Sequence, residues 1–93
     1  MSAPAIRLDG ELTIYRAAEI KPLLLPLPAA DGPVQIDLAE VSDIDSAGVQ
    51  LLLLAEREAA AARREFRLLS PSAAVREVLT LLNLQTRLAL PAA

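Results

Sequence analysis

The chain has 93 residues, 54% of them hydrophobic, and a formal net charge of −3 at pH 7. This length and apolar fraction indicate one small ordered domain, residues 1–93, that can bury a core without disulfides. The sequence contains no cysteine and no histidine, which excludes disulfides, thiolate chemistry, Ser-His-Asp catalysis and most zinc sites.

Composition also argues against nucleic acids and membranes as direct partners. Only Tyr15 and Phe66 are aromatic and no basic stripe is evident, so neither base stacking nor phosphate binding is expected. The apolar runs, such as residues 23–25 and 51–55, are far shorter than the roughly 20 residues of a membrane-spanning helix. No signal peptide is evident, so we expect a soluble cytoplasmic domain without direct membrane insertion.

The first segment of the chain predicts a β-hairpin. Residues 6–8 and 11–15 alternate in polarity on either side of the dipeptide Asp9-Gly10. That dipeptide is a hairpin turn signal, because glycine at its second position tolerates a positive φ. Two short antiparallel strands are therefore expected before the first helix.

A helix and a central strand are predicted next. Residues 17–25 have a helical pattern that contains Pro22, which removes one backbone donor and is able to kink or shorten the helix. Pro26 and Pro28 are expected to end it. Residues 34–38 alternate in polarity, which predicts a strand in the middle of the sheet.

The second half of the chain predicts two more helices. Residues 46–65 are filled by strong helix formers, and residues 66–69 predict a short strand. The helix-start signal of residues 70–72 precedes a helix that ends at about Asn83, and residues 87–90 form a last strand or a packed tail. One face of that helix is apolar: Val75, Val78, Leu79 and Leu82. This order predicts an α/β domain with a mixed sheet of about four to five strands and about three helices packed on it.

An acidic turn that contains Asp43 and Asp45 joins the central strand to the long helix, and Ser46 ends the turn. A serine at this place is a helix N-cap, a phosphate acceptor, or both. A phosphate would meet free N–H groups and the positive end of the helix dipole, but also the repulsion of the two carboxylates. Gly48 in the first turn allows close approach of either the sheet or a partner.

Helical spacing defines the face of the long helix that carries Ser46. That face holds Val49, Gln50, Leu53, Arg57, Ala60 and Arg64. A separate stripe suits the core: Gly48, Leu51, Leu52, Ala55, Ala59 and Ala62. Isolated exposed apolar residues are ordinary, whereas apolar residues beside the serine indicate a protein-contact face. We expect the contact face, with Ser46 at its end.

With these residues described, nearly the whole chain resembles the STAS domain family of sulphate transporters and anti-sigma-factor antagonists. The most specific element is Asp45-Ser46-Ala47-Gly48, which matches the family's Asp-Ser/Thr-x-Gly signature. Three further segments resemble its early strand, central strand and last strand–helix unit: residues 10–15, residues 36–38 with Val41, and residues 70–84. The resemblance therefore implies the STAS fold over residues 1–93.

The resemblance also implies a function. In the family, a partner that is both a serine kinase and an anti-sigma factor binds the unphosphorylated domain and phosphorylates the signature serine, and a phosphatase restores it. Ser46 would be the phosphorylation site, Asp45 would shape the turn, and Gly48 would let the helix start lie against the partner. The partner-binding residues so implied are Thr13, Tyr15, Asp43, Asp45, Ser46, Ala47, Gly48, Val49, Gln50, Leu53 and Arg57.

Two other settings are also compatible with this resemblance. Thr13 stands where many antagonists have aspartate, and the chain is similar to small STAS proteins of proteobacterial chemotaxis gene clusters. It is also similar to the STAS subunit that docks on a lipid-transport ATPase. The partner is then a chemotaxis signalling protein, or a transport ATPase to which the chain docks constitutively, and the helix face could also serve a homodimer.

Catalysis by this chain itself is not expected. The clustered acids Asp37, Glu40, Asp43 and Asp45 have no histidine, lysine or glycine-rich loop beside them, and the three glycines are too scattered for a phosphate-binding loop. An enzyme or a nucleotide-binding domain is therefore the less favoured class. We expect a non-catalytic protein-interaction module without cofactor or metal.

Overall fold

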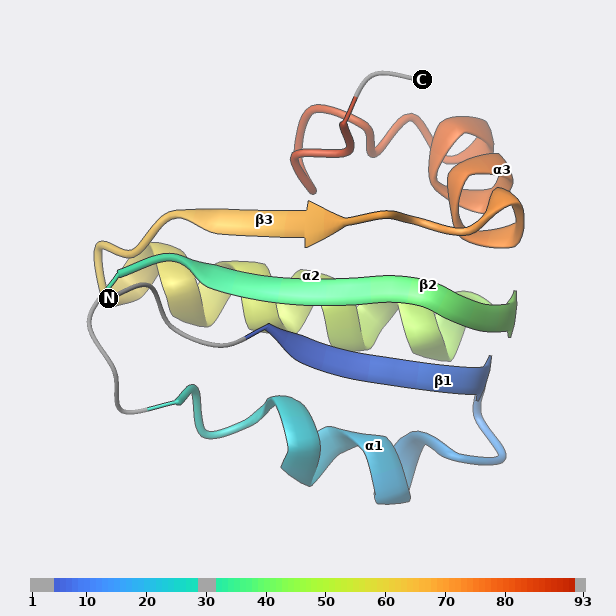
Figure 1. Cartoon of the computed structure of the whole chain (residues 1–93), viewed down its shortest axis with the longest axis horizontal. Helices are drawn as coiled ribbons and strands as arrows, with labels where there is room; N and C mark the ends of the chain where they lie inside the picture. Colours follow the sequence, from blue (N-terminus) through green and yellow to red (C-terminus); the bar gives the residue numbers. More distant parts are fainter. Residues whose placement is uncertain (1–4, 29–31, 92–93) are drawn as a thin grey trace.

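The chain folds as strands that alternate with helices (Figure 1). The computed structural model describes residues 5–28 and 32–91. Its six elements are β1 (Ile6–Leu12), α1 (Ala17–Leu24), β2 (Val34–Ile44), α2 (Ser46–Ala61), β3 (Phe66–Leu69) and α3 (Ala73–Leu81). The three strands form a parallel sheet in the order β1-β2-β3, with α1 and α2 as the crossover helices.

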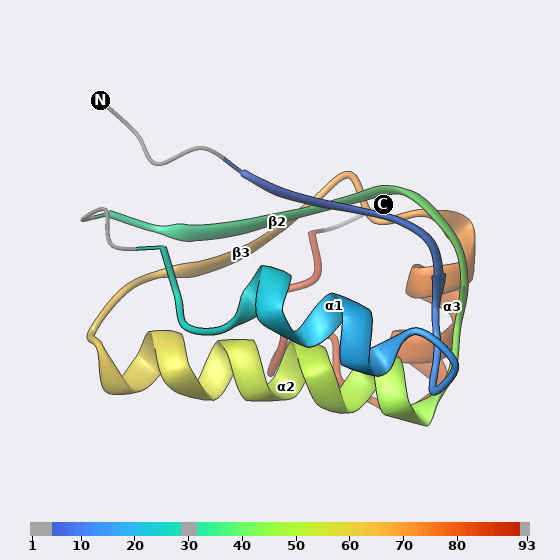
Figure 2. The same ribbon diagram turned by 90° about the horizontal axis from the view of Figure 1, so that it is seen from below.

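Both crossover helices lie on the same face of the sheet, and no helix of the described residues covers the opposite face (Figure 2). The core lies between the sheet and α1 and α2, where Leu12, Ile36 and Leu52 are fully buried. The uncovered face carries polar side chains, among them the ion pair of Arg7 and Asp37. Within the described residues, no helix combines the length and the apolar character needed to cross a bilayer.

The expected hairpin at Asp9-Gly10 is wrong. β1 runs unbroken alongside β2, Gly10 has a φ of +67°, and the pairing register shifts between Gly10 and Glu11. A glycine with positive φ serves a β-bulge as well as a hairpin turn, so the dipeptide predicts both equally well. Without the hairpin, the described residues form three parallel strands, and the expected mixed sheet of four to five strands is wrong.

Two element boundaries differ from the prediction. β2 continues past the predicted strand of residues 34–38 to Ile44. Its buried residues Leu38, Val41 and Ile44 are three apart, so strict alternation does not reveal them. α2 ends at Ala61 rather than residue 65, because Arg63 adopts a left-handed conformation with φ of 57° and the next amide bonds back into the last turn.

The carboxyl-terminal third of the structure agrees better with the prediction from the sequence. β3 has the predicted bounds, Ser72 caps α3 by accepting a hydrogen bond from the Val75 amide, and Asn83 follows the helix with φ of 57°. Leu82, predicted on the core face of α3, is half exposed. Residues 87–89 form turns and Leu88 is buried, so the packed tail rather than the strand is correct.

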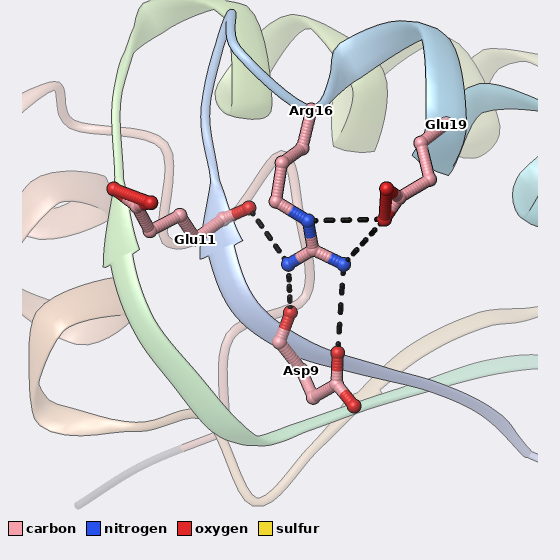
Figure 3. Close-up of polar contacts among 4 residues, drawn as sticks. All are labelled: Asp9, Glu11, Arg16 and Glu19. Atoms are coloured by element: carbon pink, nitrogen blue, oxygen red, sulfur yellow. Dashed lines mark hydrogen bonds and ion pairs between the residues drawn. The ribbon is translucent and has the colours of Figure 1, made fainter.

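The free edge of β1 is occupied by Arg16 (Figure 3). Its Nη1 donates hydrogen bonds to the carbonyl oxygens of Asp9 and Glu11, on the side of β1 that faces away from β2. Nε and Nη2 donate to Glu19 at 3.1 and 2.8 Å, which fixes the guanidinium. A Cβ at Gly10 would lie 2.7 Å from Nη1, so the glycine also leaves room for the arginine.

We expect Arg16→Ala to make this edge available to a second chain, because the Asp9 and Glu11 carbonyls lose their donor and an unpaired edge promotes strand addition. Sedimentation velocity across a concentration series should show an average mass rising towards that of a dimer. Arg7→Ala, which removes an exposed arginine of the same strand, should leave the mass unchanged. Monomeric behaviour of Arg16→Ala at every concentration would contradict this account.

Candidate functional site

Most residues of the predicted site lie where β1 and β2 end side by side, whereas Leu53 and Arg57 lie further along α2. Leu12 pairs with Ile44 at the last position of the two strands. The turn after β1, residues 13–16, and the start of α2 at Ser46 therefore leave the same edge of the sheet. Carboxyl ends of parallel strands are the usual place for binding residues in such sheets, because the loops that follow the strands converge there.

Asp45 joins these two loops. Its Oδ2 accepts a hydrogen bond from the Ile14 amide at 3.0 Å, and its Oδ1 accepts one from the Gly48 amide at 3.1 Å. Its own amide donates to the Leu12 carbonyl at 3.3 Å. One side chain thus caps α2 and fixes the turn that follows β1.

The cap of α2 is therefore Asp45 and not Ser46, which corrects one of the two roles expected of the serine. Aspartate and serine are equally good N-caps, so the sequence alone does not choose between neighbours. Ser46 is the first residue of the helix and is exposed. Within the described part of the chain its hydroxyl has no hydrogen-bond partner, which leaves it available to solvent and to other proteins.

The amides that donate to Asp45 keep its carboxylate ionised. The bond from Ile14 is the largest cause that lowers the pKa of Asp45 below its ordinary value of 3.8, followed by the bond from Gly48. Partial burial opposes this shift but does not cancel it. A carboxylate with a lowered pKa is not suited to donate a proton at neutral pH, and it adds a fixed negative charge beside Ser46.

Gly48 is buried against the end of β1. A Cβ at this position would lie 2.0 Å from the Leu12 carbonyl oxygen and 2.9 Å from side-chain atoms of Leu12 and Ile44. Of the two expected roles for Gly48, packing against the sheet is therefore the one that the geometry supports. The helix start lies against its own β1, and contact between Gly48 and a partner stays a prediction.

The exposed face of α2 is narrower than helical spacing predicts. Gln50 and Arg57 are exposed and Leu53 is half-buried, but Val49 is only 3% exposed and belongs to the core. The reason is that α1 packs against α2 in addition to the sheet, so α2 buries a wider stripe than one covering layer requires. Val49 is therefore not available for direct contact with a partner, whereas Ala62, expected in the core stripe, is exposed.

The turn after β1, which is bonded to Asp45 through the Ile14 amide, contributes exposed apolar side chains at the same edge of the sheet as Ser46. Tyr15, a predicted site residue, is 90% exposed, and Ile14, which the sequence did not single out, is 64% exposed. Ile14 continues the even-numbered series of Leu8 and Leu12, so alternation predicts that it is buried. The strand ends at Leu12, however, and the turn directs Ile14 outward.

The remaining predicted residues have mixed positions. Thr13 is 5% exposed, and its Oγ1 is buried without a hydrogen-bond partner, so it does not form part of the surface. Asp43 is exposed and accepts a hydrogen bond from the Ile44 amide, and Ala47 is half-buried. Among the described residues, no three acidic side chains come together as metal ligands would.

The role of the Asp45 carboxylate predicts a pH dependence. Because its pKa is lower in the folded chain than in the unfolded one, its stabilisation is complete above about pH 4 and is lost as the pH falls through the folded value. Asp45→Asn should therefore be less stable than the wild-type chain at neutral pH, and this difference should shrink below about pH 4. Urea denaturation of both proteins from pH 7 to pH 3 measures it, and a constant difference would contradict the account.

The close packing at Gly48 predicts a large effect of one methyl group. Gly48→Ala should lower the free energy of unfolding by about 2–3 kcal/mol, because the Leu12 carbonyl is backbone and cannot move aside. Ser46→Ala, in the same turn but exposed and not a cap, should change it by less than about 0.5 kcal/mol. Urea denaturation compares the two, and equal stability of the two variants would show that the helix start is not packed as described.

Comparison with known proteins agrees with the signature in this turn. A family model described as "Mlab, STAS domain" matches residues 1–91, which is essentially the whole chain. The matched range includes the Asp45-Ser46-Ala47-Gly48 signature and the turn that Asp45 holds. No curated protein matches the chain.

Proposed function

The chain belongs to the STAS domain family, and on this basis we propose that it is an interaction module that binds a partner protein at the start of α2. STAS domains are generally non-enzymatic modules that mediate protein–protein interaction. The observation that carries the proposal is the exposed apolar pair Ile14 and Tyr15 beside the free hydroxyl of Ser46. Tyrosine is enriched in protein interfaces because it offers a large apolar area with a polar end.

The proposed contact surface consists of Ile14, Tyr15, Ser46 and Gln50. Ile14 is bonded to Asp45, so Tyr15 and Ser46 each adjoin this hydrogen bond, and Gln50 lies one helical turn beyond Ser46. Thr13, Gly48 and Val49 support this surface from the buried side. A partner that covers the surface would meet a preformed turn and would not need to order it first.

Phosphorylation of Ser46 is the proposed switch. A phosphate adds a charge of about −1.5 to −2, and it would stand beside the carboxylates of Asp43 and Asp45. The amides of Ile14 and Gly48 are already bonded to Asp45 and are not free to offset that charge. The modified surface would therefore release its partner, which would be a serine kinase that acts as an anti-sigma factor or a chemotaxis signalling protein.

Constitutive docking on a larger assembly, such as a lipid-transport ATPase, is the second candidate. One observation favours it. At the position where many antagonists carry aspartate, this chain has a buried threonine whose hydroxyl meets no partner within the described residues. The same surface would then bind permanently, without any modification of Ser46.

Substitution of Ser46 separates the two candidates. A partner captured from the native cells with the tagged chain should be bound at least about tenfold more weakly by Ser46→Asp, because the added charge lies inside the interface. Tyr15→Ala should weaken binding through lost apolar contact, while Ser46→Ala should bind as the wild-type chain does. Biolayer interferometry measures each dissociation constant, and intact-mass spectrometry of the native protein reports any phosphate.

The matched control is Ser70→Asp, which adds the same charge at an exposed serine after β3. β3 ends beside Asp37, seven residues before the end of β2 at which the contact surface lies. If Ser46→Asp and Ser70→Asp both bind as the wild-type chain does but Tyr15→Ala binds weakly, the docking role replaces the switch. If Tyr15→Ala also binds normally, the start of α2 is not the contact surface.

A further inference from the structure

An open groove lies between α1 and α2. Figure 2 shows these two helices beside each other under the sheet. Its volume is about 180 Å³. It is lined by Lys21 from α1 and by Gln50, Leu51, Leu53, Leu54 and Arg57 from α2. The groove is therefore apolar in its middle, and both of its charged side chains are positive.

Among the described residues, no acidic side chain neutralises these two cations. No carboxylate lines the groove, and neither Lys21 nor Arg57 has an ion pair or a side-chain hydrogen bond among the described residues. Four other arginines do have acidic partners: Arg7, Arg16, Arg67 and Arg87. In a chain with a net charge of −3, the groove is thus a local positive site.

We propose that this groove binds an acidic, amphipathic segment of the partner protein. Apolar side chains of that segment would fill the groove over Leu53 and Leu54, and its carboxylates would pair with Lys21 and Arg57. The inference rests on the proposed interaction function and adds the chemistry of the partner. Gln50 belongs to both the groove and the contact surface at Ser46, so one partner can cover the two together.

The dimensions of the groove favour a peptide segment over a small molecule. Sites for small molecules usually enclose about 300–1,000 Å³, whereas this groove has about 180 Å³ and is open to solvent. Such a volume suits one or two side chains inserted from a partner. The helix-in-groove mode of recognition uses apolar anchors of this kind, spaced along one face of a helix.

The charge distribution favours a protein over a membrane. Binding to anionic lipids usually requires clusters of about four to eight basic residues, and the groove supplies Lys21 and Arg57 alone. The exposed carboxylate of Asp43 and the ionised carboxylate of Asp45 lie near the start of the same helix. An anionic bilayer would be repelled by them, whereas a narrow acidic segment would not need to approach them.

Two short synthetic peptides test the proposal on the isolated chain. They share leucines at helical spacing (i, i+3, i+4, i+7) and differ only in carrying glutamate or glutamine at the flanking positions. Fluorescence anisotropy should show binding of the glutamate peptide, on the order of millimolar or tighter, that weakens as salt rises. Amide NMR shifts should concentrate at Lys21, Gln50, Leu53, Leu54 and Arg57.

Variants supply the matched comparison. The double variant Lys21→Glu with Arg57→Glu should lose about tenfold in affinity for the glutamate peptide, and it should bind instead a peptide with lysines at the same positions. Arg63→Glu makes the same charge change at an exposed arginine outside the groove and should leave binding unchanged. The gain of lysine-peptide binding would show that the double variant is folded.

Three outcomes would overturn the groove proposal. The first is that the two peptides bind equally well or do not bind at all. The second is that anionic vesicles, and not the peptides, bind in a way that depends on Lys21 and Arg57. The third is that the chain associates with itself through the groove. None of these involves Ser46 or Tyr15. If the peptides fail while Tyr15→Ala still weakens capture of the native partner, the groove inference is wrong and the proposed function stands. If the peptides bind as expected but Tyr15→Ala has no effect, the contact surface at Ser46 is wrong and the groove stands.

Discussion

The arrangement of the site depends on one carboxylate, that of Asp45. It accepts hydrogen bonds from Ile14 in the turn after β1 and from Gly48 in the first turn of α2, and so holds together two segments that are 31 residues apart at the first contact. The absence of a side chain at Gly48 lets the helix start approach the Leu12 carbonyl closely enough for both bonds to form. Because Asp45 supplies the cap, Ser46 does not cap the helix, and it is exposed to solvent.

The sequence singled out this turn as a candidate site but did not assign the structural roles within it. The Asp-Ser-Ala-Gly signature marked the start of α2, because aspartate and serine are favoured at helix N-caps and glycine allows close packing in the first turn. Both Asp45 and Ser46 are suitable caps. The choice between them depends on the turn after β1, which bonds to Asp45 and which local propensity does not describe. The same limit explains the bulge at Gly10, since a left-handed glycine is equally consistent with a hairpin and its partner strand is distant in sequence.

The burial of individual side chains was easier to predict for a helix that packs against one neighbouring element than for a helix that packs against two. α3 has a simple apolar stripe: of its four predicted residues, Val75 and Leu79 are fully buried, Val78 is partly buried, and Leu82, which follows the end of the helix, is half exposed. α2 touches both the sheet and α1, so Val49 is buried although helical spacing places it with exposed residues. The exposure of Ile14 was not predicted, because β1 ends at Leu12, two residues earlier than the alternation of polarity indicates.

The distance between Ser46 and the groove determines how a phosphate could act on an acidic partner. Arg57 lies 11 residues after Ser46 along α2, which corresponds to about 16 Å of helix. That is about twice the Debye length at physiological ionic strength, so a phosphate at Ser46 would scarcely weaken ion pairs at Arg57. Its effect would instead fall on the part of the partner that covers Tyr15 and Gln50. Release would then follow from local repulsion and lost apolar contact at the helix start, while the groove would keep its charge and remain able to bind an acidic segment.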